Sequence, residues 1–165
     1  MAERYYITPT GGIKIKWGGP SDLKELYRQM KIWLEDNGFA SEKNLEKKYV
    51  EMIKPNGKDI FVLWEAGKDV SDYFSYKINV EFIWIATTDV EVQERGIKRK
   101  LTKGTLEVRI IAYIDYGKKW ETMGILNKFY YKNIAKSRLE DYRRELYNKI
   151  YKFQKMIKDF VGLTA

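Results

Sequence analysis

The chain has 165 residues and a net charge of +8, with 31 Lys and Arg against 23 Asp and Glu. It contains no Cys and no His, which excludes disulfide bonds, iron–sulfur clusters, Cys/His zinc sites, a Ser-His-Asp triad and general-base catalysis by His. With 44% hydrophobic and 15% aromatic residues it can bury a core, and its length predicts one domain over residues 1–165.

The first elements along the chain are predicted to be a strand and a helix. Residues 13–17 alternate apolar and basic side chains, which is the period of a half-buried strand. The Gly-Gly-Pro-Ser-Asp segment at 18–22 is expected to end this strand. Apolar residues then recur at steps of three and four over 23–34, which predicts an amphipathic helix that ends at Asn37-Gly38.

The middle of the chain predicts an antiparallel meander. Residues 49–54 and 60–64 are expected to be strands on either side of a Pro-Asn-Gly turn at 55–57. The strongest signal is the segment 74–86, in which every second residue is apolar. We therefore expect a long strand here, with one face turned toward the core.

The alternation continues in shorter pieces after this strand. Residues 90–93 and 97–101 are predicted to be extended, with a turn at Arg95-Gly96 between them. Lys103-Gly104 is expected to be a second hairpin turn. It leads into a further strand over 106–114.

Helices are predicted after the last strand, where the apolar period changes to three and a half. Apolar residues over 123–134 indicate a short helix. The Ser-x-x-Glu pattern of Ser137 and Glu140 is that of a capping box at the start of a helix. The apolar stripe over 139–160 then predicts one long helix, which ends at Gly162.

This order of elements resembles the START-like (SRPBCC) superfamily, which has the helix-grip fold and includes polyketide cyclases and plant pathogenesis-related proteins. The resemblance extends from Ile13 to Leu163 and rests on element order and on the cap and stripe of the last helix. It implies an α+β fold in which a curved antiparallel sheet of about six to seven strands grips a long C-terminal helix. It also implies an apolar cavity between sheet and helix that holds hydrophobic ligands.

An independent packing argument also predicts space beside the long helix. A helix is about 10–12 Å wide, so it cannot cover six strands that lie about 4.8 Å apart. The first helix, aromatic side chains or a ligand must fill the remainder. The sequence is equally compatible with a packed core and with a ligand pocket. We expect non-enzymatic binding of a small hydrophobic or amphipathic molecule. The predicted lining residues are Tyr76, Ile78, Val80, Phe82, Trp84, Ile110, Ala112, Tyr142, Leu146 and Ile150.

The alternative function is a basic module that binds RNA or a ribonucleoprotein, because a positive net charge favours anionic partners. The densest cluster is the 95–103 hairpin, and Arg143 and Arg144 are expected to extend it. The nucleic-acid residues are Lys98, Arg99, Lys100 and Lys103 with Arg143 and Arg144. Lysines on an exposed hairpin also prevent strand-to-strand aggregation, so a solubility role is the competing interpretation.

No motif indicates catalysis. The glycine patterns of nucleotide-binding loops are absent from the sequence, and no residue set singles itself out as catalytic or metal-binding. We therefore assign no catalytic residue, cofactor or metal, and favour a binding protein over an enzyme. No apolar run is long enough for a signal peptide or a membrane span, so we expect a cytoplasmic protein.

Overall fold

The structure, a computed structural model, describes residues 4–39, 45–134 and 136–162. Six strands and four helices are described. The strands are β1 (Arg4–Tyr6), β2 (Ile13–Ser21), β3 (Glu46–Lys54), β4 (Gly57–Asp69), β5 (Phe74–Glu94) and β6 (Ile97–Tyr116). The helices are α1 (Leu23–Asp36), α2 (Lys118–Glu121), α3 (Ile125–Ile134) and α4 (Lys136–Val161).

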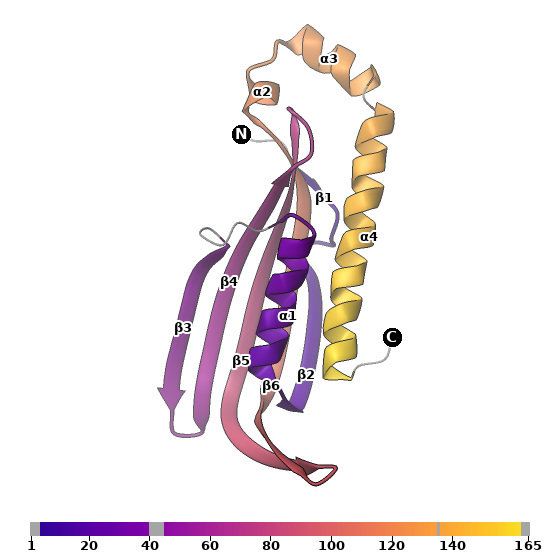
Figure 1. Ribbon diagram of the computed structural model, residues 1–165. Coiled ribbons are helices and arrows are strands. Elements are labelled where there is room, and N and C mark those ends of the chain that lie inside the picture. The colour runs from indigo at the N-terminus through magenta and orange to yellow at the C-terminus, as the bar shows by residue number, and fades with distance from the viewer. Residues whose placement is uncertain (1–3, 40–44, 135, 163–165) are drawn as a thin grey trace.

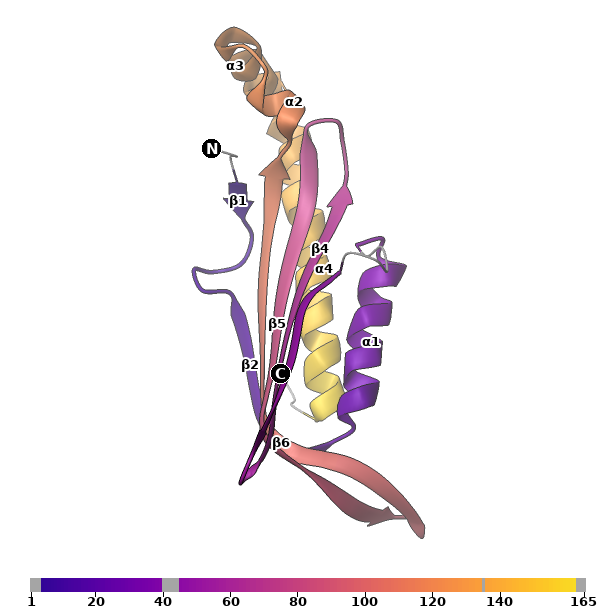
Figure 2. The ribbon, with the colours of Figure 1, turned by 90° about the vertical axis from the view of Figure 1, so that its left-hand side faces the viewer.

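The strands form one open, curved antiparallel sheet in the order β1-β6-β5-β4-β3, and β2 pairs with β6 beside β1 (Figure 1). Helices α1 and α4 lie side by side on one face of this sheet (Figure 2). The predicted α+β class with a short helix before the long one is therefore confirmed. An antiparallel sheet with a long C-terminal helix is compatible with a helix-grip fold.

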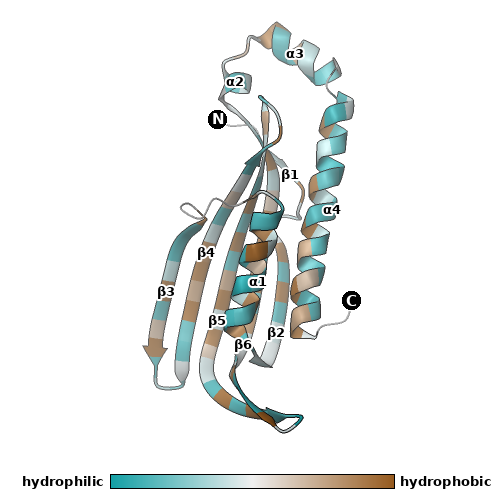
Figure 3. Cartoon of the chain, in the orientation of Figure 1, coloured by the Kyte–Doolittle hydropathy of each residue, from teal (hydrophilic) through white to brown (hydrophobic). Residues whose placement is uncertain are grey.

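The core lies between the sheet and the two helices. Over Phe74–Trp84 of β5 and Leu106–Ile114 of β6, every second residue is apolar and buried, which gives the alternating bands of Figure 3. Leu26, Met30 and Leu34 of α1 face this surface, and all three are fully buried. α4 contributes Leu146, Ile150, Phe153, Ile157 and Val161. The two helices meet where the rings of Trp33 and Phe153 stack 4.6 Å apart.

Two predicted interruptions of the sheet are wrong. β2 continues through the glycines to Ser21, because Gly19 and Pro20 pair with Gly104 and Lys103 of β6. Gly104 is therefore inside a strand and is not a turn. A Cβ at Gly104 would lie 2.7 Å from the Ile85 carbonyl oxygen and 2.8 Å from Trp84 Nε1. Glycine is needed here for close packing against Trp84.

The two predicted segments 74–86 and 90–93 belong to one strand. β5 runs from Phe74 to Glu94, and its pairing with β6 shifts register between Ile85 and Thr88. Ala86 has a φ of 54°, which is left-handed. This bulge bends the end of the β5–β6 hairpin toward the face that carries the helices (Figure 2). The predicted turn at Arg95-Gly96 is confirmed.

The predicted capping box is also wrong. α4 begins at Lys136, so Ser137 lies in its first turn and is not the cap. The Glu140 carboxylate pairs with Arg143 one turn further along the helix. None of the described helices combines the length and the apolar composition that a membrane span requires.

Candidate functional site

A pocket of about 680 Å³ opens between α1, strands β3 to β5 and the bent end of the hairpin. We call it the α1–β3 pocket. Its lining residues are Leu23, Lys24, Tyr27, Glu46, Tyr49, Glu51, Lys58, Ile60, Val62, Phe82, Thr87, Asp89 and Thr102. The pocket exists because α1 and α4 cover β2, β5 and β6, while the outer part of the sheet extends past them (Figure 1).

The floor of the pocket is apolar. Ile60, Val62 and Phe82 project from β4 and β5 on the side of the sheet that faces the helices. Side chains two residues apart on a strand point to the same face, and Val62 lies opposite Phe82 in the strand pairing. The three residues therefore lie on the face that carries the core. Leu23 of α1 closes one side. A ligand lying on this floor would bury apolar surface.

A tyrosine–glutamate pair forms one polar wall. The Tyr27 hydroxyl donates a hydrogen bond to the Glu46 carboxylate, and Trp64 Nε1 donates to the same oxygen at 3.3 Å. The Tyr27 and Trp64 rings meet edge to face at 5.0 Å. Burial and the hydrogen bond to Glu46 raise the pKa of Tyr27 well above its usual value. Tyr27 is therefore a neutral donor at physiological pH.

A second polar wall lies at the rim, on β3 and β4. The Tyr49 hydroxyl donates to Glu51 at 2.7 Å, and Lys58 Nζ lies 3.0 Å from the other oxygen of that carboxylate. The hydrogen bonds from Tyr49 and Lys58 lower the pKa of Glu51. Burial and the hydrogen bond to Glu51 raise the pKa of Tyr49 to about 12. The rim thus carries an ionised carboxylate and a neutral phenol.

Two charged side chains of the lining are not engaged in hydrogen bonds of the kind that hold the two polar walls. Among the described residues, Lys24 and Asp89 have no ion pair and no side-chain hydrogen bond. Lys24 comes from the start of α1, and Asp89 comes from the hairpin beyond the bulge. The two charges are therefore available to polar groups of a bound molecule.

The bend of the hairpin shapes the remaining wall. Asp59, which is buried, accepts a hydrogen bond from the Ala86 N–H at 2.9 Å. The Thr87 hydroxyl donates to the Lys58 carbonyl oxygen at 2.6 Å. These contacts join the beginning of β4 to the bulge of β5. They direct Thr87, Asp89 and Thr102 across one end of the pocket.

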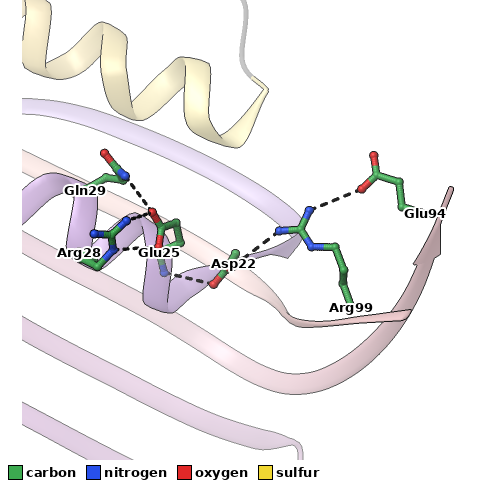
Figure 4. A network of polar contacts seen from close by, with 6 residues as sticks. All are labelled: Asp22, Glu25, Arg28, Gln29, Glu94 and Arg99. Carbon is green, nitrogen blue, oxygen red and sulfur yellow. Dashed lines mark hydrogen bonds and ion pairs between the residues drawn. The ribbon is translucent and has the colours of Figure 1, made fainter. Parts of the chain in front are cut away.

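The hairpin tip is also tied to the beginning of α1 (Figure 4). Asp22 caps α1 by accepting a hydrogen bond from the Glu25 N–H at 3.1 Å. Its other oxygen lies 3.8 Å from the Arg99 guanidinium, which also lies 3.6 Å from Glu94. Through these two contacts Arg99 helps to hold the bent hairpin beside the pocket. In the first turn of α1, hydrogen bonds from Arg28 and Gln29 lower the pKa of Glu25 to about 2.

The structure places the ten sequence-predicted lining residues mainly in the packed core. Nine are buried, Tyr142 is half-buried, and Phe82 is shared with the α1–β3 pocket. Beside α4, two of the three expected fillers of the remaining space are present, namely α1 and aromatic rings such as Trp33 and Phe39. Ligand binding by those ten residues as a set stays a prediction.

A polar pair lies within this predicted region. The Tyr76 hydroxyl donates to Glu145 at 2.8 Å, and Lys149 lies 3.3 Å from the same carboxylate. Burial and the hydrogen bond to Glu145 raise the pKa of Tyr76 well above its usual value. Burial alone would raise the pKa of Glu145, but hydrogen bonds from Tyr76 and Lys149 outweigh it and lower the pKa.

Sequence reasoning missed most of the α1–β3 pocket. The helix at 23–34 and the strand around 60–64 were both predicted, and they supply part of the lining. Tertiary packing decides which strands α1 covers, and the periodicity of the sequence does not reveal that choice. The useful signal was the mixture of apolar residues with Tyr, Glu and Lys over 46–62.

The predicted basic residues lie in two separate places. Lys98, Lys100 and Lys103 are exposed on the hairpin, while Arg99 pairs with Asp22 and Glu94. Arg143 lies 3.5 Å over the Tyr5 ring, near the opposite end of β6. Arg144 is next to it on α4 and is exposed. The two groups therefore do not form one continuous surface.

Comparison with known proteins adds no family. The chain matches no family model, no curated protein and no solved structure at a significant level. Within the described part of the chain, no group of three or more Asp or Glu residues has the arrangement of a metal site. The geometry of the α1–β3 pocket is therefore the main indication of function.

Proposed function

We propose that this chain binds a small amphipathic molecule, without catalysis, in the α1–β3 pocket. The observation that carries the proposal is a pocket of about 680 Å³ with an apolar floor and a polar rim. Small-molecule sites commonly have volumes of about 300–1,000 Å³ and combine apolar walls with a few polar groups. The pocket lies on the helix-facing side of the sheet, beside α1 and away from α4, whereas the sequence led us to expect a cavity between the sheet and the C-terminal helix.

The lining specifies the chemistry of the ligand. Its apolar body would lie on Ile60, Val62 and Phe82. Its polar groups would meet Lys24 and Asp89, so a head group with both hydrogen-bond donors and acceptors, or with both charges, is favoured. The neutral Tyr27 and Tyr49 hydroxyls and the ionised Glu51 are held in mutual hydrogen bonds, which favours recognition over proton transfer.

The same position supports a relation to the START-like superfamily. In the helix-grip arrangement the ligand lies on the face of the sheet that carries the long helix, and the α1–β3 pocket, lined by α1, β4 and β5, opens on the face that carries α1 and α4 here. We propose that relation on architecture and pocket position together.

The direct test is to extract the purified protein with organic solvent and identify bound molecules by mass spectrometry. Wild-type protein is expected to release a small amphipathic compound in near-stoichiometric amount. Val62→Phe should lose it, because the larger side chain occupies the floor of the pocket. Val92→Phe is the matched control, since Val92 lies on the hairpin outside the lining. A clean wild-type extract, or equal loading of Val62→Phe, would contradict the proposal.

A second candidate is binding of RNA or a ribonucleoprotein by the β5–β6 hairpin. The observation in its favour is that this hairpin projects beyond the rest of the sheet with Lys98, Lys100 and Lys103 exposed (Figure 2). Glu91 lies directly opposite Lys100 in the strand pairing and offsets part of the charge. The hairpin would therefore offer a narrow basic surface.

This candidate is tested by replacing Lys98, Lys100 and Lys103 with Ala while keeping Arg99, which holds the hairpin to α1. Each phosphate contact should contribute a slope of about −0.7 to −0.9 to log affinity against log salt. Arg144→Ala is the control, because Arg144 lies near the opposite end of β6 from the hairpin. Binding that the triple variant leaves unchanged would identify the lysines as a solubility feature.

A further inference from the structure

Helix α3 carries a row of large apolar side chains that are exposed to solvent. The exposed fractions are 86% for Ile125, 85% for Leu126, 71% for Phe129 and 65% for Tyr130. Single exposed apolar residues are ordinary on protein surfaces, but a contiguous patch on one short helix marks a contact surface.

The four side chains lie on one face of α3. At about 100° per residue, positions 125, 126, 129 and 130 fall within an arc of about 140°. Tyr131 points in nearly the opposite direction, and its ring contacts Tyr73 at 4.6 Å and Trp120 at 6.2 Å. Tyr131 thus holds α3 to the body of the protein and leaves the apolar face turned outward.

α3 occupies a prominent position in the molecule. It lies beyond the ends of the strands, at the end of the sheet where β6 finishes, and the hairpin lies at the other end (Figures 1 and 2). The beginning of the helix is apolar in Figure 3. A flat surface can therefore approach this face without meeting the sheet.

The surrounding sequence is strongly basic. Residues 118–138 contain one acid, Glu121, and six basic residues: Lys118, Lys119, Lys128, Lys132, Lys136 and Arg138. Most of the excess positive charge of the chain is therefore concentrated around α3. Two copies meeting through this face would bring like charges together, which disfavours a dimer.

We propose that α3 docks on the surface of a membrane that contains anionic lipids. Apolar and aromatic side chains on one face of a helix, flanked by lysines, are what an interfacial helix needs. Ile125, Leu126 and Phe129 enter the boundary between head groups and acyl chains, and Lys128 and Lys136 contact lipid phosphates. This surface is distinct from the α1–β3 pocket, so the docking of α3 and the proposed ligand binding stand or fall separately.

The test is co-sedimentation of the full chain with vesicles made of equal parts of phosphatidylcholine and phosphatidylglycerol. Wild-type protein should bind these vesicles and bind pure phosphatidylcholine much more weakly. Leu126→Ser combined with Phe129→Ser should lower the partition coefficient at least about tenfold, since less apolar surface is buried. Ile53→Ser combined with Ile97→Ser is the matched control, because these side chains are 88% and 66% exposed elsewhere.

A charge variant tests the second half of the proposal. Lys128→Gln combined with Lys136→Gln should weaken binding to the anionic vesicles by about fivefold for each lysine and leave the weak binding to phosphatidylcholine unchanged. Circular dichroism and thermal unfolding should show that both α3 variants remain folded, because the altered side chains lie outside the core.

Three results would overturn the proposal. The first is wild-type protein that does not bind the anionic vesicles. The second is vesicle binding that depends on the lysines but not on Leu126 and Phe129, which would show that charge alone attracts the protein and that the apolar face of α3 does not enter the membrane. The third is a wild-type dimer that becomes monomeric in the Leu126→Ser, Phe129→Ser variant, measured by light scattering. That result would show that a second copy covers the face.

Discussion

Asp59 accepts a hydrogen bond from the backbone N–H of Ala86 at 2.9 Å, and its other carboxylate oxygen lies 2.5 Å from Lys54 Nζ. Ala86 has a left-handed φ of 54°, a conformation that residues with a side chain seldom adopt. The carboxylate thus supports the bulge that bends β5. Since the bent segment supplies Thr87 and Asp89 to the α1–β3 pocket, the contact also shapes the candidate site.

Replacing Asp59 with Ala is expected to loosen the bend. The Ala86 N–H would lose its acceptor, and the Lys54 ammonium would lose its ion-pair partner. Hydrogen–deuterium exchange should become faster over residues 86–103 while the core of β6 around Ile110 stays protected. Glu65→Ala on the same strand is the control, because that side chain is exposed. Unchanged exchange over 86–103 in Asp59→Ala would contradict the role assigned to this carboxylate.

The Asp59 contact also predicts a pH dependence. The hydrogen bond from the Ala86 N–H, followed by that from Lys54, lowers the pKa of Asp59 below its ordinary value. The unfolded chain therefore binds more protons, so this contribution to stability is present above about pH 4 and is lost as the pH falls through the folded-state pKa. Asp59→Asn should show a smaller loss of stability on acidification than wild type in urea titrations. Parallel curves would refute the linkage.

Ala86 itself tests the cost of the left-handed backbone. Glycine adopts this conformation freely, so Ala86→Gly should leave the free energy of unfolding unchanged or raise it by up to about 1 kcal/mol. A β-branched residue fits poorly, and Ala86→Val should lower it by about 1–2 kcal/mol. Urea unfolding followed by far-ultraviolet circular dichroism measures both. Equal stabilities of the Gly and Val variants would mean that the bulge relaxes without cost.

Gly104 is predicted to be intolerant of a methyl group. A Cβ there would approach the Ile85 carbonyl oxygen to 2.7 Å and Trp84 Nε1 to 2.8 Å. Gly104→Ala should therefore lower the free energy of unfolding by about 1–3 kcal/mol, as overpacking does. Gly18→Ala on the adjoining strand is the control, because the nearest atom to its Cβ would be 4.0 Å away. If the two variants are equally stable, β6 can move away from Trp84.

Ile150 tests the packing of α4 on the sheet. The side chain is fully buried. Ile150→Ala is expected to lower the free energy of unfolding by about 2–5 kcal/mol, and Ile150→Asp should prevent folding because it buries an unpaired charge. Asn148→Ala, at an exposed position two residues earlier, should have little effect. Thermal unfolding that is insensitive to Ile150→Ala would contradict the placement of α4.

The elements that were predicted correctly are those whose signal is local. The stripe of α1 and the alternation of β5 each follow from a period that neighbouring residues define. The α+β class and the long C-terminal helix follow from these periods taken in order. The six-stranded sheet is likewise confirmed.

The errors concern positions whose role is set by distant residues. The Lys103-Gly104 pair is typical of a turn. Gly104 nevertheless pairs with Gly19 and packs against the Trp84 ring, and both residues are far away in sequence. The pocket could not be predicted for the same reason, since the contact between Asp59 and Ala86 decides where the hairpin points. A pattern records which face a residue occupies but not which element covers that face.

The position of β3 at the edge of the sheet has a consequence for solubility. Among the strands that the structure describes, β3 pairs with β4 alone, so its outer backbone groups could accept a strand from another molecule. Its sequence is Glu-Lys-Lys-Tyr-Val-Glu-Met-Ile-Lys, in which at most two uncharged residues separate one charged residue from the next. A strand approaching from another copy would have to desolvate these charges, and lysines at such edges oppose that pairing. The composition of β3 thus protects the chain from polymerising through the sheet on which its candidate ligand pocket is built.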